Sequence, residues 1–283
     1  MVSGAGPLPH VGAAVEVLEA GPPDGPLLLL LHGFPQTPSC WQRLLPALAA
    51  AGYRSVAPTQ RGYGLSPRPQ AVAEYGIETL VKDVLALADR LGAPTFSVVG
   101  HDWGGAIAWR LAADHPERLV SCTSLATPHP AALAQAALRS TQALRSLYVP
   151  FFRLPVLPER ALLAGRGAVF REILVTSGLD QKSAKVYVEA MRQPGALSAA
   201  LNWYRAASPT GLARTGPSRV PTLFVWGSRD LALGRAAASA SGRHVDAPYR
   251  FEALEGASHW LPEQHSAAVA EVLVPHLLEH GPH

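Results

Sequence analysis

Residues 95–105 read TFSVVGHDWGG, and this stretch decides the fold. Its first half is a β-branched and aromatic run that predicts a buried strand over 95–99, and the apolar spacing after it predicts a helix over about 105–113. Between the two, Gly100 and Gly104 flank Asp102 at two residues on either side. A strand-to-helix turn this tight holds its central residue in a strained conformation that exposes the side chain. The stretch therefore predicts an exposed carboxylate at the carboxyl end of a strand.

Similar runs recur along the chain on both sides of this turn. Short apolar runs lead into segments whose apolar residues lie three and four apart. Alternation of strand and helix indicates parallel strands joined by crossover helices, and hence an α/β fold with a mostly parallel sheet flanked by helices. We expect strands over 27–31, 54–57, 95–99, 119–125, 221–226 and 249–254, and helices over 41–51, 77–91, 105–113 and 267–278.

The alternation stops between residues 129 and 217, where the sequence is helix-like and rich in Ala, Leu and Arg. The simplest account is one α/β domain, formed by residues 1–128 and 218–283, that carries residues 129–217 as an inserted helical cap. Ligands bind open α/β sheets beyond the carboxyl ends of the strands, so an inserted layer there would roof the site. Ahead of the first predicted strand, residues 11–20 leave room for one edge strand.

The composition excludes wholesale disorder and argues against a nucleic-acid-binding protein. The 283 residues include 24 Lys plus Arg and 21 Asp plus Glu, so the net charge is +3, and 48% of residues are hydrophobic. This suits a globular protein with a large core. Because the arginines form no run, the sequence offers no basic footprint for a nucleic acid.

Cysteine usage and hydropathy give further expectations. Cys40 and Cys122 make neither a disulfide framework nor a multi-thiolate metal site. The apolar run over 27–31 is far short of the roughly 20 residues that span a bilayer. No nucleotide-binding or metal-ligand pattern occurs. We therefore expect a cytoplasmic protein without a membrane span, a cofactor or a metal.

Asp102 occupies the position at which a serine hydrolase with this turn carries serine, and the substitution changes the reaction. A serine that attacked an sp³ carbon would leave an ether that water does not readily cleave. A carboxylate leaves an alkyl ester, which water can hydrolyse at the carbonyl carbon. Asp102 therefore indicates attack on a carbon that bears a leaving oxygen or halide. In the alternative interpretation, Asp102 only caps the following helix.

Hydrolysis of such an ester requires a base, and two further residues directly follow predicted strands. Asp230 comes after a glycine turn, and His259 comes after the final strand. In the general logic of a catalytic triad, Asp230 holds the His259 imidazole in the right tautomer and His259 deprotonates water. Three other acidic residues compete for the role of Asp230, namely Asp246, Glu252 and Glu255. None of them follows the carboxyl end of a predicted strand after a glycine turn.

The sequence HGFP at 32–35 directly follows the first predicted buried strand. In this architecture, the backbone N–H of Phe34 would lie beside that of Trp103. Two such donors form an oxyanion hole for a tetrahedral intermediate. We interpret His32 as a structural hydrogen-bonding residue rather than a second base.

Five motifs together resemble the soluble epoxide hydrolases of the α/β-hydrolase superfamily, and the likeness spans nearly the whole chain. They are HGFP at 32–35, RGYGLS at 61–66, GHDWGG at 100–105, Gly-x-x-Asp ending at Asp230, and SHW at 258–260. The resemblance implies the α/β-hydrolase fold and the conversion of an epoxide and water to a vicinal diol. It also implies that Tyr148 and Tyr204 of the cap donate hydrogen bonds to the epoxide oxygen. Thr59 departs from the aspartate common in relatives, and we expect an effect on stability.

Two other functions remain open at this point. A haloalkane dehalogenase shares the aspartate nucleophile, the following tryptophan and the histidine base. However, Phe34 stands where those enzymes tend to have Asn or Glu, and the tyrosine pair suits an oxygen leaving group. A binding protein that kept the fold without turnover is the second alternative, and the intact set of Asp102, Asp230 and His259 argues against it. The expected partner is a small-molecule epoxide, and the chain is expected to be a monomer or a homodimer.

Overall fold

The computed structural model describes residues 3–9 and 14–281, and within them eight strands form one sheet in the order β1-β2-β4-β3-β5-β6-β7-β8. The pairs from β4 through β8 are parallel, whereas β2 pairs antiparallel with both β1 and β4. This confirms the predicted α/β class. The strands are β1 Ser3–Pro9, β2 Ala14–Ala20, β3 Leu27–Leu31, β4 Arg54–Pro58, β5 Phe96–His101, β6 Leu119–Leu125, β7 Thr222–Gly227 and β8 Tyr249–Leu254.

The prediction of one edge strand before residue 27 is wrong, because β1 and β2 form an antiparallel pair that extends the sheet past β4. The sequence of β1 is SGAGPLP. Glycine and proline are depleted in strands, so this segment is not typical of one. An edge strand tolerates them because one side of its backbone pairs with no neighbour. Residues 10–13, between the two strands, lie outside the described residues.

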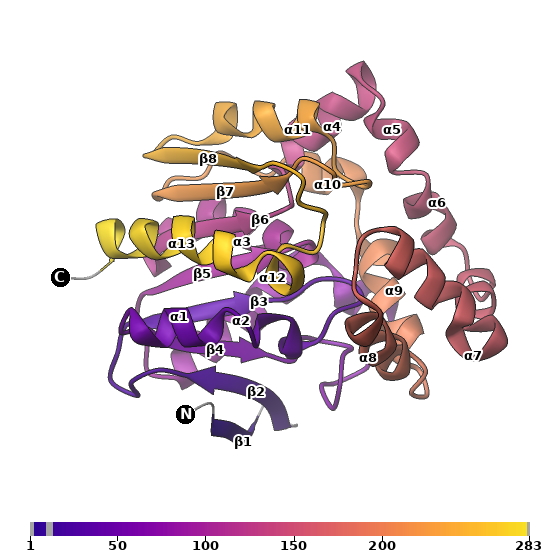
Figure 1. Cartoon of the computed structure of the whole chain (residues 1–283), viewed down its shortest axis with the longest axis horizontal. Coiled ribbons are helices and arrows are strands. Elements are labelled where there is room, and N and C mark those ends of the chain that lie inside the picture. Colours follow the sequence, from indigo (N-terminus) through magenta and orange to yellow (C-terminus); the bar gives the residue numbers. More distant parts are fainter. Residues whose placement is uncertain (1–2, 10–13, 282–283) are drawn as a thin grey trace.

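Helices cover both faces of the sheet (Figure 1). On one face α1 contacts α13, and on the other α2 contacts α3. The predicted helices over 77–91, 105–113 and 267–278 are confirmed as α2, α3 and α13, whereas the one over 41–51 is divided into a 3₁₀ turn, Pro38–Trp41, and α1. The bounds are α1 Leu45–Ala50, α2 Ile77–Arg90, α3 Trp103–Asp114, α11 Arg235–Ala240, α12 Leu261–Gln264 and α13 Ser266–His280.

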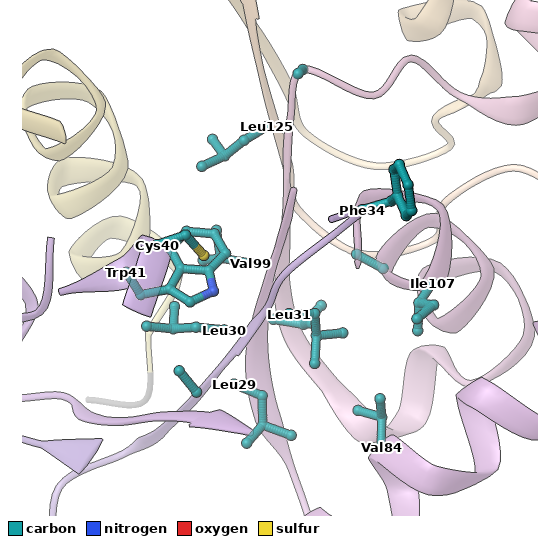
Figure 2. Close-up of a cluster of buried hydrophobic side chains, with 14 of the residues drawn as sticks. Leu29, Leu30, Leu31, Phe34, Cys40, Trp41, Val84, Val99, Ile107 and Leu125 are labelled. Carbon is teal, nitrogen blue, oxygen red and sulfur yellow. The ribbon is translucent and has the colours of Figure 1, made fainter. Parts of the chain in front are cut away.

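The centre of the core is β3, whose five leucines are all buried. Successive side chains of a strand point to opposite faces, so a strand covered on both faces must be apolar throughout. Figure 2 shows Leu30 beside Trp41 on one side of the strand and Leu31 facing Ile107 of α3 on the other. This packing fixes the point at which β3 ends and residues 32–35 begin.

Seven further helices of the described chain lie between β6 and β7 in sequence. In Figure 1, α5 to α9 gather beside the sheet rather than over either face. The helix α6 packs against α9, whereas α4 packs against α11 of the α/β part. The helix α7 is interrupted at 164–167 by non-helical backbone. The bounds are α4 Pro130–Arg139, α5 Gln142–Arg145, α6 Tyr148–Arg153, α7 Leu157–Thr176, α8 Gln181–Met191, α9 Ala196–Ala206 and α10 Pro209–Ala213.

Candidate active site

Asp102 lies in the turn between β5 and α3 with a φ of 52° and a ψ of −118°, a conformation that non-glycine residues rarely adopt. The turn is this tight because the backbones touch. A Cβ on Gly100 would collide with the Gly104 carbonyl, and one on Gly104 would collide with the Leu31 carbonyl. The glycines therefore allow the strand, the turn and the helix to approach, and the predicted strained turn is present.

Two backbone donors meet the Asp102 carboxyl. The Phe34 N–H, from the loop after β3, donates to Asp102 Oδ1 at 2.7 Å, and the Trp103 N–H also donates to the carboxyl. Phe34 reaches this position because Gly33 has no side chain, since a Cβ there would collide with Asp102. The structure thus brings the two predicted oxyanion-hole residues together on one carboxyl group.

Asp230 and His259 form a hydrogen-bonded pair facing Asp102. His259 Nδ1 lies 2.7 Å from Asp230 Oδ2, and the other carboxylate oxygen accepts from the N–H groups of Ala232 at 2.8 Å and Leu233 at 2.9 Å. With Asp230 fixed in this way, His259 Nε2 points at Asp102 Oδ2 from 3.8 Å. That separation is too long for a direct hydrogen bond, so the contact between the two side chains is one of charge.

Two of the three competing acids, Glu252 and Glu255, form ion pairs elsewhere. Glu252 pairs with Arg250 at 2.7 Å, and Glu255 pairs with Arg235 at 3.2 Å. The described partner of His259 Nδ1 is therefore Asp230, as the order of the strands predicts.

Burial and neighbouring charges move the pKa values of this group in opposing directions. Burial raises the pKa of Asp102, against the opposing effects of His259 and the two backbone donors. Burial alone lowers the pKa of His259, but Asp230, Asp102 and Glu263 outweigh it and raise that pKa to about 9. At neutral pH His259 is therefore protonated, and its charge favours the ionised form of the neighbouring Asp102 carboxyl group.

Tyr148, at the start of α6, and Tyr204, on α9, lie over Asp102. Their ring centroids are 6.1 Å apart, and the Tyr204 ring meets the Trp103 ring edge-on at 5.1 Å. Burial, with a contribution from the Asp102 charge, raises the pKa of both phenols. Both hydroxyls therefore keep their protons at neutral pH and are available as donors.

Two cavities meet at this group, and Asp102, Tyr148 and Tyr204 line both. One has a volume of about 420 Å³ and extends under α4 and α6, where Leu133 and Ala137 line it. The other has a volume of about 470 Å³ and is lined by apolar side chains such as Phe152 and Phe170, together with His259. Each volume lies within the range of about 300–1,000 Å³ typical of small-molecule sites. The site is therefore suited to an apolar ligand whose reactive atom lies at Asp102.

A buried group beside the site was missed by the sequence analysis. His101 lies 2.8 Å from Gln36 through Nδ1 and 2.9 Å from the His259 carbonyl oxygen through Nε2, and Gln36 contacts Glu263. The sequence signal was only that Gln36 follows the HGFP motif, His101 lies inside GHDWGG and Glu263 comes three residues after SHW. His32, in contrast, accepts from the Gln60 N–H at 3.3 Å, as expected of a structural residue.

In the loop that carries Thr59, Arg61 forms its ion pair with a carboxylate from outside the loop. Arg61 makes two contacts with Asp83 of α2, at 2.6 and 2.7 Å. The Thr59 N–H donates to the Glu16 carbonyl at 2.8 Å, and its own carbonyl accepts from Ser66. Asp83 therefore supplies a carboxylate for Arg61 although residue 59 has none.

Within residues 3–9 and 14–281, no cluster of three or more His, Cys, Asp or Glu side chains has the arrangement of a metal site. None of the helices in the described part of the chain is long and apolar enough to cross a membrane.

Comparison with known proteins agrees with this geometry. A family model described as the α/β hydrolase fold matches residues 26–266. The AB hydrolase superfamily protein YfhM of Bacillus subtilis is 37% identical over 94% of this chain and 95% of its own length, and epoxide hydrolase A of Mycobacterium tuberculosis is 31% identical over 94% of both. The crystal structure of epoxide hydrolase A from Mycobacterium thermoresistibile superposes with a TM-score of 0.81 at 26% identity, covering 96% of this chain and 97% of that one. The chain therefore belongs to the epoxide hydrolase family of the α/β-hydrolase superfamily.

Proposed function

We propose that this protein converts an epoxide and water to a vicinal diol through an alkyl ester on Asp102. The observation that carries the proposal is the unequal setting of the two Asp102 oxygens. Oδ1 accepts the Phe34 N–H at 2.7 Å, whereas Oδ2 faces His259 across 3.8 Å, and the residue lines both cavities. Oδ2 is therefore the oxygen available to attack, and Oδ1 is the one held in an oxyanion hole.

In the first step, Asp102 Oδ2 attacks an epoxide carbon and the carbon–oxygen bond of the ring breaks. Negative charge develops on the departing oxygen, and Tyr148 and Tyr204 stabilise it by hydrogen bonding and supply a proton. Their raised pKa values keep both protons in place until that charge appears. The tyrosine that gives its proton regains one from the His259 imidazolium, so the products of this step are the ester on Asp102, a free hydroxyl on the neighbouring carbon and a neutral His259.

In the second step, neutral His259 removes a proton from a water molecule, which attacks the Asp102 carbonyl carbon. The charge then forms on Oδ1, to which the Phe34 N–H already donates at 2.7 Å, and the Trp103 N–H donates to the same carboxyl group. Collapse of the intermediate breaks the ester bond, His259 returns the proton to the leaving alkoxide, and the diol departs. Asp230 keeps His259 in the required tautomer and stabilises its cation.

The helical insertion supports this assignment, and we propose that residues 129–217 act as its cap. Both tyrosines come from it, and its helices line both cavities. Since these cavities are mainly apolar and meet at Asp102, the proposed substrate is an epoxide with apolar substituents.

A haloalkane dehalogenase remains the second candidate, because the nucleophile and the base are shared. The Trp103 side chain hydrogen-bonds to Tyr204, so its indole N–H is engaged rather than free to hold a halide. Phe34 offers no polar side chain at the other halide-binding position. The named epoxide hydrolases among the relatives favour the same choice.

The test is accumulation of the ester. His259→Gln should form an adduct on the peptide containing Asp102 and release diol very slowly, and intact-protein mass spectrometry should show the added mass of the epoxide. Asp102→Asn is the matched control and should form none. Supplying haloalkanes in parallel, with released halide measured, separates the two candidates. Absence of an adduct from His259→Gln that still binds substrate would count against the covalent mechanism.

A further inference from the structure

A chain of buried polar groups connects the helical insertion with the loops around Asp102. The Tyr187 hydroxyl, on α8, donates to Glu263 Oε1 at 2.7 Å, and Gln36 Nε2 donates to the same oxygen at 2.7 Å. Tyr187, Gln36 and Glu263 are 1%, 0% and 4% exposed, so these bonds are shielded from water. In a low-dielectric interior such hydrogen bonds hold their geometry more firmly than surface contacts do.

The far end of this chain contacts the backbone that forms the site. Gln36 Oε1 accepts the Gly33 N–H at 2.8 Å, and Gly33 directly precedes the oxyanion donor Phe34. The same oxygen lies 2.8 Å from His101, which directly precedes Asp102 and contacts the carbonyl oxygen of His259 at 2.9 Å. One glutamine side chain thus touches the segments that present the oxyanion donor and the nucleophile, and reaches the base through His101.

Burial of the Glu263 carboxyl group has a desolvation cost, so packing alone does not account for this residue. Burial raises the pKa of its carboxyl group, and its Oε2 has no hydrogen-bond partner among the described residues. Replacement of a buried charged group by an apolar one of similar size is often neutral or stabilising. The acceptor at Oε1 is the feature that an apolar residue does not reproduce, since both Gln36 and Tyr187 donate to it.

We propose that Glu263 is a positioning residue for hydrolysis of the ester on Asp102, acting through Gln36 on the loop that presents the Phe34 N–H. This inference rests on the proposed function. Alkylation needs Asp102 Oδ2 and the two cap tyrosines, none of which hydrogen-bonds to Glu263 or Gln36 in the described structure. Charge forms on Oδ1 during hydrolysis, so displacement of the Phe34 donor weakens that step most. Tyr187 makes the position of this loop depend on the docking of α8.

The two steps are separated by single-turnover measurements of adduct formation and adduct decay. Glu263→Leu removes the acceptor and should slow decay roughly tenfold or more while formation changes much less, because small displacements of aligned groups cost large factors in rate. Glu263→Gln keeps an acceptor oxygen for both donors and should restore decay to within roughly threefold of the wild type. Equal slowing of both steps by Glu263→Leu would overturn the proposal, as would a Glu263→Gln variant as slow as Glu263→Leu.

Tyr187→Phe provides a milder test that preserves the ring if Glu263→Leu fails to fold. It removes one buried hydroxyl bond and should slow adduct decay without slowing formation. The matched control is Tyr53→Phe, because the Tyr53 hydroxyl donates to the Leu277 carbonyl at 2.6 Å in contact with α13, away from the site. The control should lose stability and leave both steps unchanged. If the two variants behave alike, the positioning role is refuted.

Failure of this inference is distinguishable from failure of the proposed function. If the wild type forms no adduct on Asp102, the covalent mechanism falls and the inference falls with it. If the adduct forms and its decay is insensitive to Glu263→Leu and Tyr187→Phe, only the positioning role is overturned.

Discussion

Alkylation of Asp102 should convert His259 from an imidazolium into a base, and this prediction depends directly on the distance between the two side chains. In the resting protein, Asp230, Asp102 and Glu263 together raise the pKa of His259 to about 9 although burial opposes them. At neutral pH the residue is therefore protonated and unable to accept a proton from water. Formation of the ester removes the charge of Asp102, and only the other two carboxyl groups remain to support the cation.

The distance gives the size of the effect. At 3.8 Å between His259 Nε2 and Asp102 Oδ2, two unit charges interact by about 4 kcal/mol at an effective dielectric constant of about 20. A change of 1.36 kcal/mol corresponds to a change of 1 in pKa, so loss of the Asp102 charge lowers the pKa of His259 by at most about 3. A fall of that order brings the pKa toward neutrality. The tyrosinate left after a tyrosine protonates the alkoxide is a stronger base than imidazole, because burial raises the pKa of both phenols, so it takes up the released proton.

Asp102→Asn provides a neutral mimic of the ester for the measurement. NMR titration of the imidazole resonances, with His259→Gln used to assign the signal, should give a clearly lower pKa for His259 in Asp102→Asn than in the wild type. In single-turnover experiments, adduct decay should retain its rate well below pH 9. The same pKa in Asp102→Asn and in the wild type would refute the reasoning, because the Asp102 charge would then contribute nothing to the cation.

Three further outcomes follow from the same contacts. Tyr148→Phe or Tyr204→Phe removes one donor to the developing alkoxide, which elsewhere costs on the order of 3 kcal/mol, so adduct formation should slow roughly a hundredfold or less, and the double variant should be nearly inactive in rapid-quench assays. Ala137→Trp should narrow the 420 Å³ cavity and lower kcat/KM for epoxides with two apolar substituents more than for small terminal ones, and equal losses on both would contradict the assignment of that cavity to substrate. Because the folded-state pKa of His259 is about 9 against an ordinary 6.5, its ionisation contributes up to about 3 kcal/mol of stability that is fully present below pH 6.5 and lost as pH rises through 9. Urea unfolding at several pH values should show this loss in the wild type and not in His259→Gln.

The sequence predicts best those elements whose structure is determined by residues within the same short segment. β3 has the predicted bounds, because an apolar run between turns has few alternatives. The turn at Asp102 follows from two glycines, at positions where the Cβ of any other residue would collide with the backbone. The missed strand, β1, is the opposite case, because its glycines and prolines carry no strand signal and only its pairing with β2 makes it a strand.

The buried contacts of the site could not be predicted from the sequence, because the residues that form them are far apart along the chain. Gln36 and Glu263 are separated by 227 positions, and Gln36 and His101 by 65. Polar residues of these types lie on the surface in most proteins, so no spacing distinguishes a buried pair from a solvated one. Arg61 presents the same difficulty, since it lies in a loop and its partner Asp83 lies on the helix α2.

The insertion is tied to the site at a second place, which bears on what it contributes beyond two tyrosines. On α5, Gln142 donates to the Ala232 carbonyl at 2.8 Å and accepts the Gly234 N–H at 2.8 Å, while Arg145 donates to the Asp230 carbonyl at 2.8 Å. These bonds hold the loop in which Asp230 receives its own backbone donors. The helix α8 reaches the opposite side of the site through Glu263. An insertion that only roofed a cavity would need neither set of bonds. In the proposed mechanism, the acid, the base and the oxyanion donor are therefore all held in part by hydrogen bonds from helices that lie between β6 and β7 in the chain.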